Sequence, residues 1–384
     1  MPFQFQTAGR IYFGCGEAAR LGAVAAEWGR RVLFMTGRHP QRWDDLRGQL
    51  ALQRLATTVW RIETEPTVEM IDRAVAAARE AGADLVVAVG GGSVIDAGKA
   101  VAAMLANDGA LSDYLEIVGQ GRALTQPSRP CIAVPTTAGT GAEVTRNAVL
   151  SAASHEVKVS LRSPFMMPCV AIVDPELTVA MPPAMTAGTG MDALTQLIEA
   201  LVSSKANPLT DGICRVGLPS AARCLPRAFE DGRDLAAREG MSLASLCGGL
   251  ALANAGLGAV HGLAGPLGGM IHAPHGMICA ALLPAVMAAN IEALRRQRPD
   301  SIYLQRYREV ACLLTGRPDA GANEGVDRVR RLVDQLALPG LSTLGLKAAE
   351  FEAAVDKASR ASSMKGNPVV LGADALEGIL KSAF

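Results

Sequence analysis

The sequence is poor in aromatic residues, in net charge and in long apolar runs, and each shortage excludes a class of protein. Phe, Trp and Tyr make up 4% of the 384 residues, which fits an all-β sandwich poorly. Lys and Arg (37) balance Asp and Glu (37), so the electrostatic footprint of nucleic-acid binding is missing. No apolar run approaches the length of about 18 residues that a membrane span needs. The first residues resemble no secretory signal, so we expect a cytoplasmic globular protein with neither nucleic-acid nor membrane partners.

The eight cysteines are scattered along the chain. The closest two, Cys214 and Cys224, are ten residues apart, and no CxxC motif occurs. A zinc ribbon and a thioredoxin-type pair are thereby excluded. We expect reduced and mostly buried thiols.

Strand and helix patterns alternate through the first half of the chain. Apolar runs predict strands, and segments of helical spacing predict the helices between them, which indicates a parallel sheet. The expected strands are 31–36, 57–63, 84–90 and 131–135, with shorter ones at 147–151, 157–161 and 170–174, and the expected helices are 40–55, 66–82 and a segment ending at 106.

Helical spacing takes over after residue 183, and strand-like alternation disappears. We expect helix breaks at prolines, namely Pro208, Pro219, Pro226, Pro266, Pro274, Pro284 and Pro299. The predicted fold class is therefore α/β plus all-α: a dinucleotide-binding domain with a parallel sheet at 1–182, and a helical metal and substrate domain at 183–384.

A glycine-rich segment follows the expected strand 84–90. Gly91 and Gly92 would let a pyrophosphate approach the backbone N–H groups of a helix N-terminus, and Ser93 and Asp96 have the spacing of a capping box. Ile95 stands where the last glycine of a GxGxxG motif would be, so the segment is not a Rossmann fingerprint. A tight turn without a ligand is the alternative.

A second polar loop, residues 135–145, follows the expected strand 131–135. The hydroxyls of Thr136, Thr137 and Thr140 could donate to phosphate or ribose oxygens. A single loop of this kind is an ordinary turn about as often as it is a ligand-binding loop. Two such loops at the carboxyl edge of one sheet are typical of nucleotide-binding α/β proteins.

Three of the five histidines, His261, His272 and His275, fall within fifteen positions of the helical half. Asp192 precedes Gln196 by four, which places both on one helical face. One carboxylate and two imidazoles make a three-ligand metal site with an open position, as in catalytic centres. The alternative is ordinary core or surface histidines.

These clusters, in this order, resemble the iron-containing (group III) alcohol dehydrogenase family, with more distant similarity to glycerol dehydrogenases and dehydroquinate synthase. The resemblance extends over nearly the whole chain, and short segments carry it. They are 90–99 (GGGSVIDAGK), 135–145 (PTTAGTGAEVT), Lys158, 174–177 (DPEL), 189–195 (TGMDALT) and 256–276 (GLGAVHGLAGPLGGMIHAPHG).

The resemblance implies a dehydroquinate synthase-like architecture with the active site between the domains, and a homodimer. It assigns the cofactor positions Gly91, Gly92, Ser93, Asp96, Thr136, Thr137, Thr140 and Lys158, and the metal positions Asp192, Gln196, His261 and His275. Segment 362–368 resembles the stretch that closes the family's pocket.

The sequence departs from the family pattern at two positions near the metal. Gln196 stands where relatives usually have histidine, and its neutral amide oxygen is a weaker ligand for Fe(II) or Zn(II). Gly265 stands where many relatives have a second histidine. We expect His272 to replace that histidine as proton relay, with a surface or supporting position as the alternative, and His261 to act as a ligand in catalysis.

A third departure concerns the cofactor. Gly37, after the expected strand 31–36, replaces the aspartate with which relatives hold the ribose 2′-hydroxyl, and Arg38 and Arg42 lie nearby. Loss of that carboxylate predicts that NADP(H) is accepted beside NAD(H). The alternative is that both arginines face solvent.

Together these features predict a metal-dependent NAD(P) oxidoreductase, with Fe(II) or Zn(II), that interconverts a small alcohol and its aldehyde or ketone. A metal-independent reductase resembling maleylacetate reductase is a second hypothesis, supported by Gln196. A nucleotide-binding homologue without catalysis is a third, supported by Gln196 and Gly265.

Overall fold

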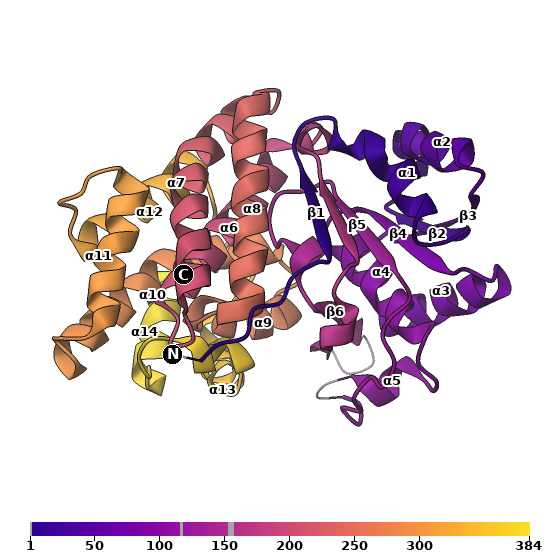
Figure 1. Cartoon of the computed structure of the whole chain (residues 1–384). Coiled ribbons are helices and arrows are strands. Elements are labelled where there is room, and N and C mark those ends of the chain that lie inside the picture. Colours follow the sequence, from indigo (N-terminus) through magenta and orange to yellow (C-terminus); the bar gives the residue numbers. More distant parts are fainter. Residues whose placement is uncertain (1, 116–117, 153–156) are drawn as a thin grey trace. The chain divides into compact units, whose positions relative to one another are not determined.

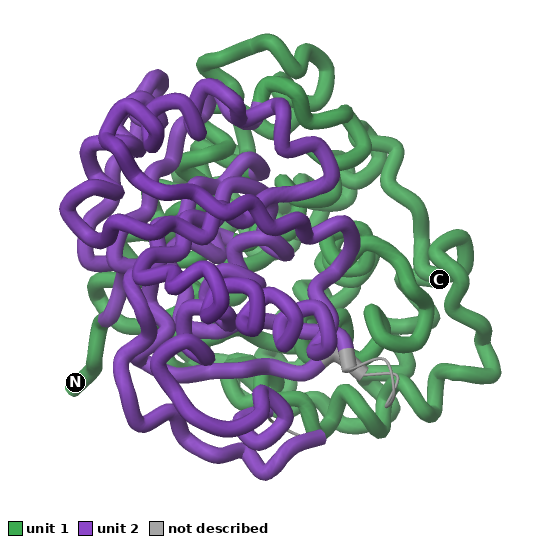
Figure 2. Tube along the Cα trace, turned by 90° about the vertical axis from the view of Figure 1, so that its right-hand side faces the viewer, with its two compact units in different colours: residues 1–5, 138–140, 179–384 green, residues 6–137, 141–178 purple. Residues whose placement is uncertain are grey.

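The computed structural model describes residues 2–115, 118–152 and 157–384, except the side chains of residues 152, 157 and 158. The chain divides into two compact units, coloured separately in Figure 2. One is mainly sheet and helix, residues 6–137 and 141–178, and the other, residues 1–5, 138–140 and 179–384, is helical. The predicted domains, 1–182 and 183–384, differ from these units because segments 1–5, 138–140 and 179–182 group with the helices.

The α/β unit is built on a six-stranded sheet whose described pairs are all parallel (Figure 1). The strand order is β1-β8-β5-β4-β2-β3. Their bounds are β1 (Arg10–Phe13), β2 (Arg31–Thr36), β3 (Ala56–Arg61), β4 (Leu85–Gly90), β5 (Cys131–Pro135) and β8 (Val170–Val173). The first strand, β1, has no counterpart in the sequence prediction. The predicted strands near 147 and 157 form a separate antiparallel hairpin of β6 (Asn147–Ala152) and β7 (Val157–Arg162).

Alternate residues of the central strands pack on opposite faces of the sheet, as a two-residue period requires. Val32 and Phe34 join the core formed with α1 (Leu21–Ala26) and α2 (Asp44–Leu52). Leu33 and Met35 join the core formed with α3 (Val68–Glu80) and α4 (Gly92–Met104). Both faces of the sheet are covered, which explains why its strands read as continuous apolar runs. A short helix, α5 (Leu111–Tyr114), follows α4.

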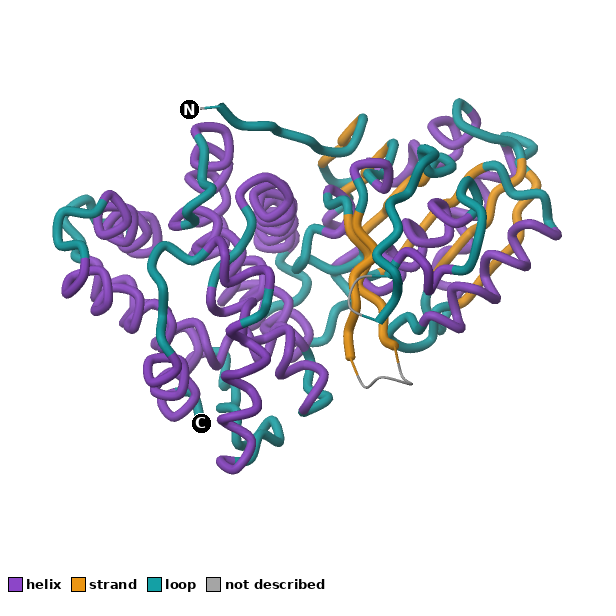
Figure 3. Tube along the Cα trace, turned by 90° about the horizontal axis from the view of Figure 1, so that it is seen from below, coloured by secondary structure: helices purple, strands orange, loops and turns teal. Residues whose placement is uncertain are grey.

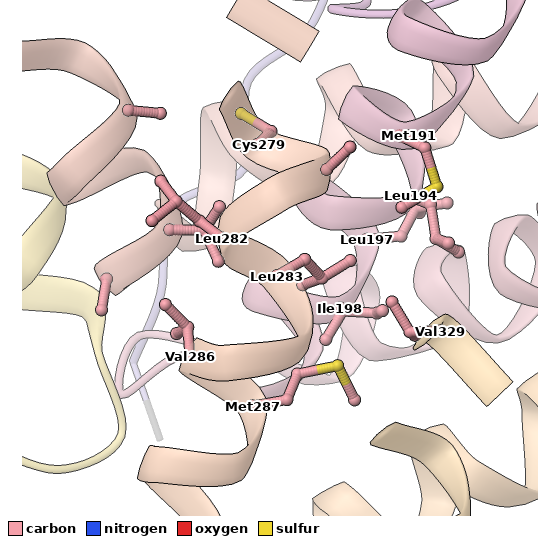
Figure 4. Close-up of a cluster of buried hydrophobic side chains, with 14 of the residues drawn as sticks. Met191, Leu194, Leu197, Ile198, Cys279, Leu282, Leu283, Val286, Met287 and Val329 are labelled. Atoms are coloured by element: carbon pink, nitrogen blue, oxygen red, sulfur yellow. The ribbon is translucent and has the colours of Figure 1, made fainter. Parts of the chain in front are cut away.

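All the long helices of the second unit follow residue 182, and Figure 3 shows helices and loops there. Their bounds are α6 (Pro183–Val202), α7 (Pro208–Glu230), α8 (Leu235–Ala255), α9 (Ala259–Met270), α10 (His275–Gln297), α11 (Ile302–Thr315), α12 (Ala322–Gln335), α13 (Phe351–Ser359) and α14 (Ala373–Ser382). Side chains of α6, α10 and α12 share one core, where Figure 4 labels Leu197, Leu283 and Val329.

Four predicted helix breaks are wrong. Pro219 and Pro226 lie inside α7, Pro266 inside α9 and Pro284 inside α10. A proline removes one backbone hydrogen bond, but these helices bury much of their surface in a common core, and such tertiary packing overrides local propensity.

Helix α10 is long and apolar enough to span a membrane by composition. However, 72% of its most apolar window is buried inside the protein. This is the pattern of a core helix, and α10 indeed contributes Leu282, Leu283 and Val286 to the core.

Candidate active site

The sheet reverses its direction of growth between β2 and β4. From β2 the chain crosses outward to β3, whereas from β4 it proceeds to β5 and then β8 on the other side. Ligands of doubly wound sheets bind at the carboxyl ends of the strands at such a switch point. Gly37 and Arg38 follow β2, and Gly91 and Gly92 follow β4, so topology brings these four predicted cofactor residues to one edge.

The start of α4 is accessible to a ligand. Gly91 precedes the helix and Gly92 begins it, both half-buried, and Ser93 is exposed. The N–H groups of Val94 and Ile95 already donate to the Gly91 carbonyl, whereas the first helical N–H groups have no acceptor within a helix. A pyrophosphate is the kind of anion that such groups bind.

The predicted capping box is wrong. The residue that caps α4 is Gly91, and no side chain in the described part of the chain caps this helix. Asp96 instead accepts a hydrogen bond from the Val149 N–H (2.9 Å) and pairs with Lys99 (2.9 Å). Ser93 lies two positions after this cap, inside the first turn of the helix, so it does not cap α4.

Lys99 is fully buried, and its ammonium group contacts three oxygen atoms. Its ammonium donates to the Ala142 carbonyl (2.9 Å) and the Thr145 hydroxyl (3.0 Å) besides pairing with Asp96. Burial raises the pKa of nearby Glu143 to about 7, although the positive charge of Lys99 opposes this. The described contacts therefore give Asp96, predicted to bind cofactor, a structural connection from α4 to segment 142–149.

The two glycine-bearing loops meet within the α/β unit. The Thr136 N–H donates to the Gly90 carbonyl (2.9 Å). A Cβ placed on Gly91 would lie 3.3 Å from the Thr137 side chain, so a larger residue there would crowd the approach to the backbone. This supports the predicted close approach of a ligand at Gly91.

Two other predicted cofactor residues are not brought to that edge by the described contacts. Thr140 is exposed and belongs to the three-residue segment that groups with the helical unit. The backbone of Lys158 pairs with Ser151 in the β6–β7 hairpin, but its side chain lies outside the described residues.

At the end of β2, Gly37 is half-buried, and a Cβ there would meet no described atom within 4 Å. Arg38 is exposed and donates from Nε to the Glu63 carbonyl at 2.6 Å. The Arg42 guanidinium lies 5.5 Å from the centre of the Trp43 ring. The end of β2 therefore has space beside Gly37 and two positively charged side chains, Arg38 and Arg42, nearby.

The helical unit gathers four metal-binding side chains from three helices. Asp192 comes from α6, His261 from α9, and His275 and Cys279 from α10. One ligand atom of each lies within 4.8 Å of those of the other three. Of the predicted metal positions, the structure thus brings together Asp192, His261 and His275, and it adds a cysteine.

The distances within this cluster suit a metal ion. His261 Nε2 and His275 Nε2 lie 3.2 Å and 3.9 Å from Asp192 Oδ1, and Cys279 Sγ lies 3.6 Å from His275 Nε2 and 4.0 Å from His261 Nε2. Bonds of about 2.0–2.3 Å at tetrahedral angles around zinc separate donor atoms by about 3.3–3.6 Å. The donor set and its spacing therefore fit a divalent metal.

A buried carboxylate orients His261. Glu199 Oε2 lies 2.6 Å from His261 Nδ1, and Glu199 Oε1 accepts from the Val260 N–H, also at 2.6 Å. Because Nδ1 donates to the carboxylate, Nε2, which faces Asp192, is the ring nitrogen left to bind a metal, as in the carboxylate–histidine pairs of metal sites. Asn367 supports the same helix by accepting from the Ala259 N–H (3.2 Å).

The pKa shifts show that the cluster favours positive charge. Burial alone would raise the pKa of Asp192 and of Cys279, but the neighbouring imidazoles hold both below their ordinary values. Burial lowers the pKa of His261, but Cys279, Glu199 and Asp192 raise it well above the usual range. The pKa of His275 is raised chiefly by the negative charge of Cys279. A bound metal cation would offset the negative charge of Asp192, Cys279 and Glu199 in the same way as the protonated imidazoles do.

Gln196 and His272 make no described contact with the other donors. Gln196 is buried on α6, and its Oε1 lies against Gly248 of α8, 2.9 Å from where a Cβ would stand, without a hydrogen bond to any described residue. His272 is exposed, with a left-handed φ of 47°. Gly265 is exposed too, and a Cβ there would meet no described atom within 4 Å.

Sequence reasoning missed Cys279 and Glu199. Cys279 follows His275 by four residues, the same one-turn spacing that selected Asp192 and Gln196. Glu199 follows Asp192 by seven residues and so lies on the same face of α6. Both signals are present in the sequence. Cys279 is free and buried, as expected for most of the thiols, but its place in the cluster was not predicted.

The chain matches known proteins along nearly its whole length. Residues 8–175 match the family described as iron-containing alcohol dehydrogenase, and residues 186–384 match its C-terminal domain. Alcohol dehydrogenase 4 of Schizosaccharomyces pombe is 35% identical over 324 residues, which cover 84% of this chain and 74% of that protein.

Solved structures agree. A 1,3-propanediol oxidoreductase superposes with a TM-score of 0.92 at 32% identity, covering 100% of both chains. Sulfoacetaldehyde reductase of Bifidobacterium kashiwanohense, solved in complex with NAD⁺, superposes with a TM-score of 0.89 at 29% identity, covering 100% of this chain and 99% of that one.

Proposed function

Because the chain belongs to the iron-containing alcohol dehydrogenase family, we propose that it is a metal-dependent, nicotinamide-linked oxidoreductase that interconverts a small alcohol and its aldehyde or ketone. The observation that carries the proposal is the convergence of Asp192, His261 and His275 from three helices. A carboxylate and two imidazoles leave room for a substrate oxygen, as catalytic metal sites require.

The site residues of the helical unit would have distinct tasks in this reaction. Asp192, His261 and His275 would hold a divalent metal, which would supply Lewis acidity toward the alcohol or carbonyl oxygen. Glu199 holds the His261 ring in the orientation that presents Nε2. The side chains of Asp192 and His261 are 3% and 9% exposed and that of His275 is 37% exposed, so substrate would approach beside His275 while water is excluded behind it.

In the α/β unit, the N–H groups at the start of α4 would bind the cofactor pyrophosphate, next to Gly91 and Thr137. We propose that NADP(H) is accepted beside NAD(H), because Gly37 leaves no carboxylate to repel a 2′-phosphate. Thr136, Thr137 and Thr140 stay predicted residues of the nicotinamide half, Lys158 stays a predicted cofactor contact, and His272 stays the predicted proton relay.

The homodimer expected from the resemblance and the cytoplasmic location expected from the first residues both stay predictions. Sedimentation of the purified protein measures the first and cell fractionation the second.

Turnover measured as nicotinamide absorbance tests the proposed function. The protein is stripped with a chelator, reloaded with Zn(II) or Fe(II), and assayed with ethanol, 1,3-propanediol and their aldehydes. We expect activity only after reloading. Equal activity in the stripped protein would instead support the metal-independent reductase, and tight cofactor binding without turnover across a wide panel would support the non-catalytic homologue.

A further inference from the structure

The cluster contains one sulfur donor that the family pattern does not include. Cys279 lies one turn after His275 on α10. Its Sγ lies 3.6 Å from His275 Nε2 and 4.0 Å from His261 Nε2, and it is fully buried. The sulfur therefore occupies the place of a fourth donor around the centre defined by Asp192 and the two imidazoles.

The residue at the family's fourth metal position, Gln196, has a buried amide oxygen that accepts no hydrogen bond from the described residues. Gln196 Oε1 lies against Gly248 of α8, whereas the clustered donors come from α6, α9 and α10. An amide is also neutral, so it would do less than a thiolate to neutralise a divalent cation. The histidine that is usual at position 196 is missing here, and a buried sulfur is present at position 279. Counting this sulfur, the number of donors stays at four.

We propose that Cys279 is a metal ligand in this protein, binding as a thiolate in place of the fourth donor that the family pattern puts at Gln196. The inference rests on the proposed function only in taking the metal site as given. On coordination the thiol releases its proton to solvent and a metal–sulfur bond forms, with no change of oxidation state. A soft thiolate favours zinc over iron, and zinc can expand to five ligands to admit substrate.

X-ray absorption at the zinc edge of the reloaded wild-type protein tests the proposal without measuring activity. We expect one sulfur neighbour at about 2.3 Å together with nitrogen and oxygen neighbours at about 2.0–2.1 Å. The Co(II)-substituted protein should show thiolate-to-cobalt charge-transfer absorption in the near ultraviolet. Both measurements need only the wild-type chain, and Cys279 is the only cysteine of the cluster among the described residues.

Two variants test which cysteine supplies the sulfur neighbour of the metal. Cys279→Ser should lose the sulfur neighbour and the charge-transfer band and bind zinc at least about tenfold more weakly. Cys247→Ser, which removes another buried thiol of the same unit, should keep all three properties. Zinc bound through nitrogen and oxygen alone in the wild type would overturn the role of Cys279 while leaving the proposed function intact. Failure to bind any divalent metal would overturn both.

Discussion

The contact between Glu199 and His261 gives the sharpest test of the metal site. The Glu199 carboxylate accepts two hydrogen bonds of 2.6 Å, from His261 Nδ1 and from the Val260 N–H, and the residue is 4% exposed. In Glu199→Gln one acceptor oxygen becomes an NH₂ donor. If the amide oxygen keeps the Val260 bond, the NH₂ group faces Nδ1, which must then accept.

The two outcomes of this substitution both weaken metal binding. An accepting Nδ1 moves the imidazole proton to Nε2, and a protonated Nε2 cannot bind a metal. The opposite amide orientation leaves the Val260 N–H facing another donor in a buried place, which costs about 1–3 kcal/mol. Loss of such a carboxylate partner typically weakens metal affinity about 10–100-fold, equivalent to about 1.4–2.8 kcal/mol.

Competition against a chromophoric chelator measures the zinc dissociation constant of the wild type, of Glu199→Gln and of Glu292→Gln. The last removes an exposed carboxylate from α10 and should bind zinc like the wild type. Nitrogen chemical shifts of His261 in the metal-free protein, recorded at a pH above the raised His261 pKa so that the ring is neutral, report the tautomer. An unchanged zinc affinity in a folded Glu199→Gln protein would refute the reasoning, because it would mean that the carboxylate does not set the tautomer.

Three further predictions concern the α/β unit. Gly37→Asp has room for its side chain and should shift the kcat/KM ratio at least about tenfold toward NADH by repelling a 2′-phosphate; an unchanged ratio contradicts the proposed NADP(H) use. Burial raises the pKa of Glu143 from 4.5 to about 7, so wild-type stability falls as pH rises from 4.5 through 7. Glu143→Gln should therefore gain about 2–3 kcal/mol in urea unfolding at pH 8 and much less at pH 5; an equal gain at both would exclude this titration. Lys99→Met leaves Asp96 without its partner and should cost about 3–5 kcal/mol in the same assay, whereas a loss under 1 kcal/mol would show that the buried ammonium is dispensable.

Local patterns predicted the parts of the fold that depend on local signals. The apolar run that became β4 and the glycines that open α4 were found because a buried parallel strand and a helix N-terminus have characteristic residues. The predictions failed where distant contacts decide. β1 forms by pairing with β8 from the far end of the unit, and Pro284 lies inside a helix because the surrounding core stabilises it.

For the site, spacing along the chain identified Asp192, Gln196 and the group of three histidines, and the resemblance selected His261 and His275 from that group. Spacing shows only which residues share a helix face, whereas ligation depends on where that face points. The structure places the Gln196 oxygen beside Gly248 of α8 and brings Cys279 to the other donors.

The sheet, the glycine turn and three candidate metal ligands could thus be predicted from the amino-acid sequence, because they follow from local periodicity, residue chemistry and the resemblance. Which carboxylate contacts His261 and which further side chain lies beside the candidate ligands became visible only in the folded structure. Those choices depend on how α6, α9 and α10 pack together, and the packing of three helices separated in sequence by up to about one quarter of the chain is encoded in no single segment.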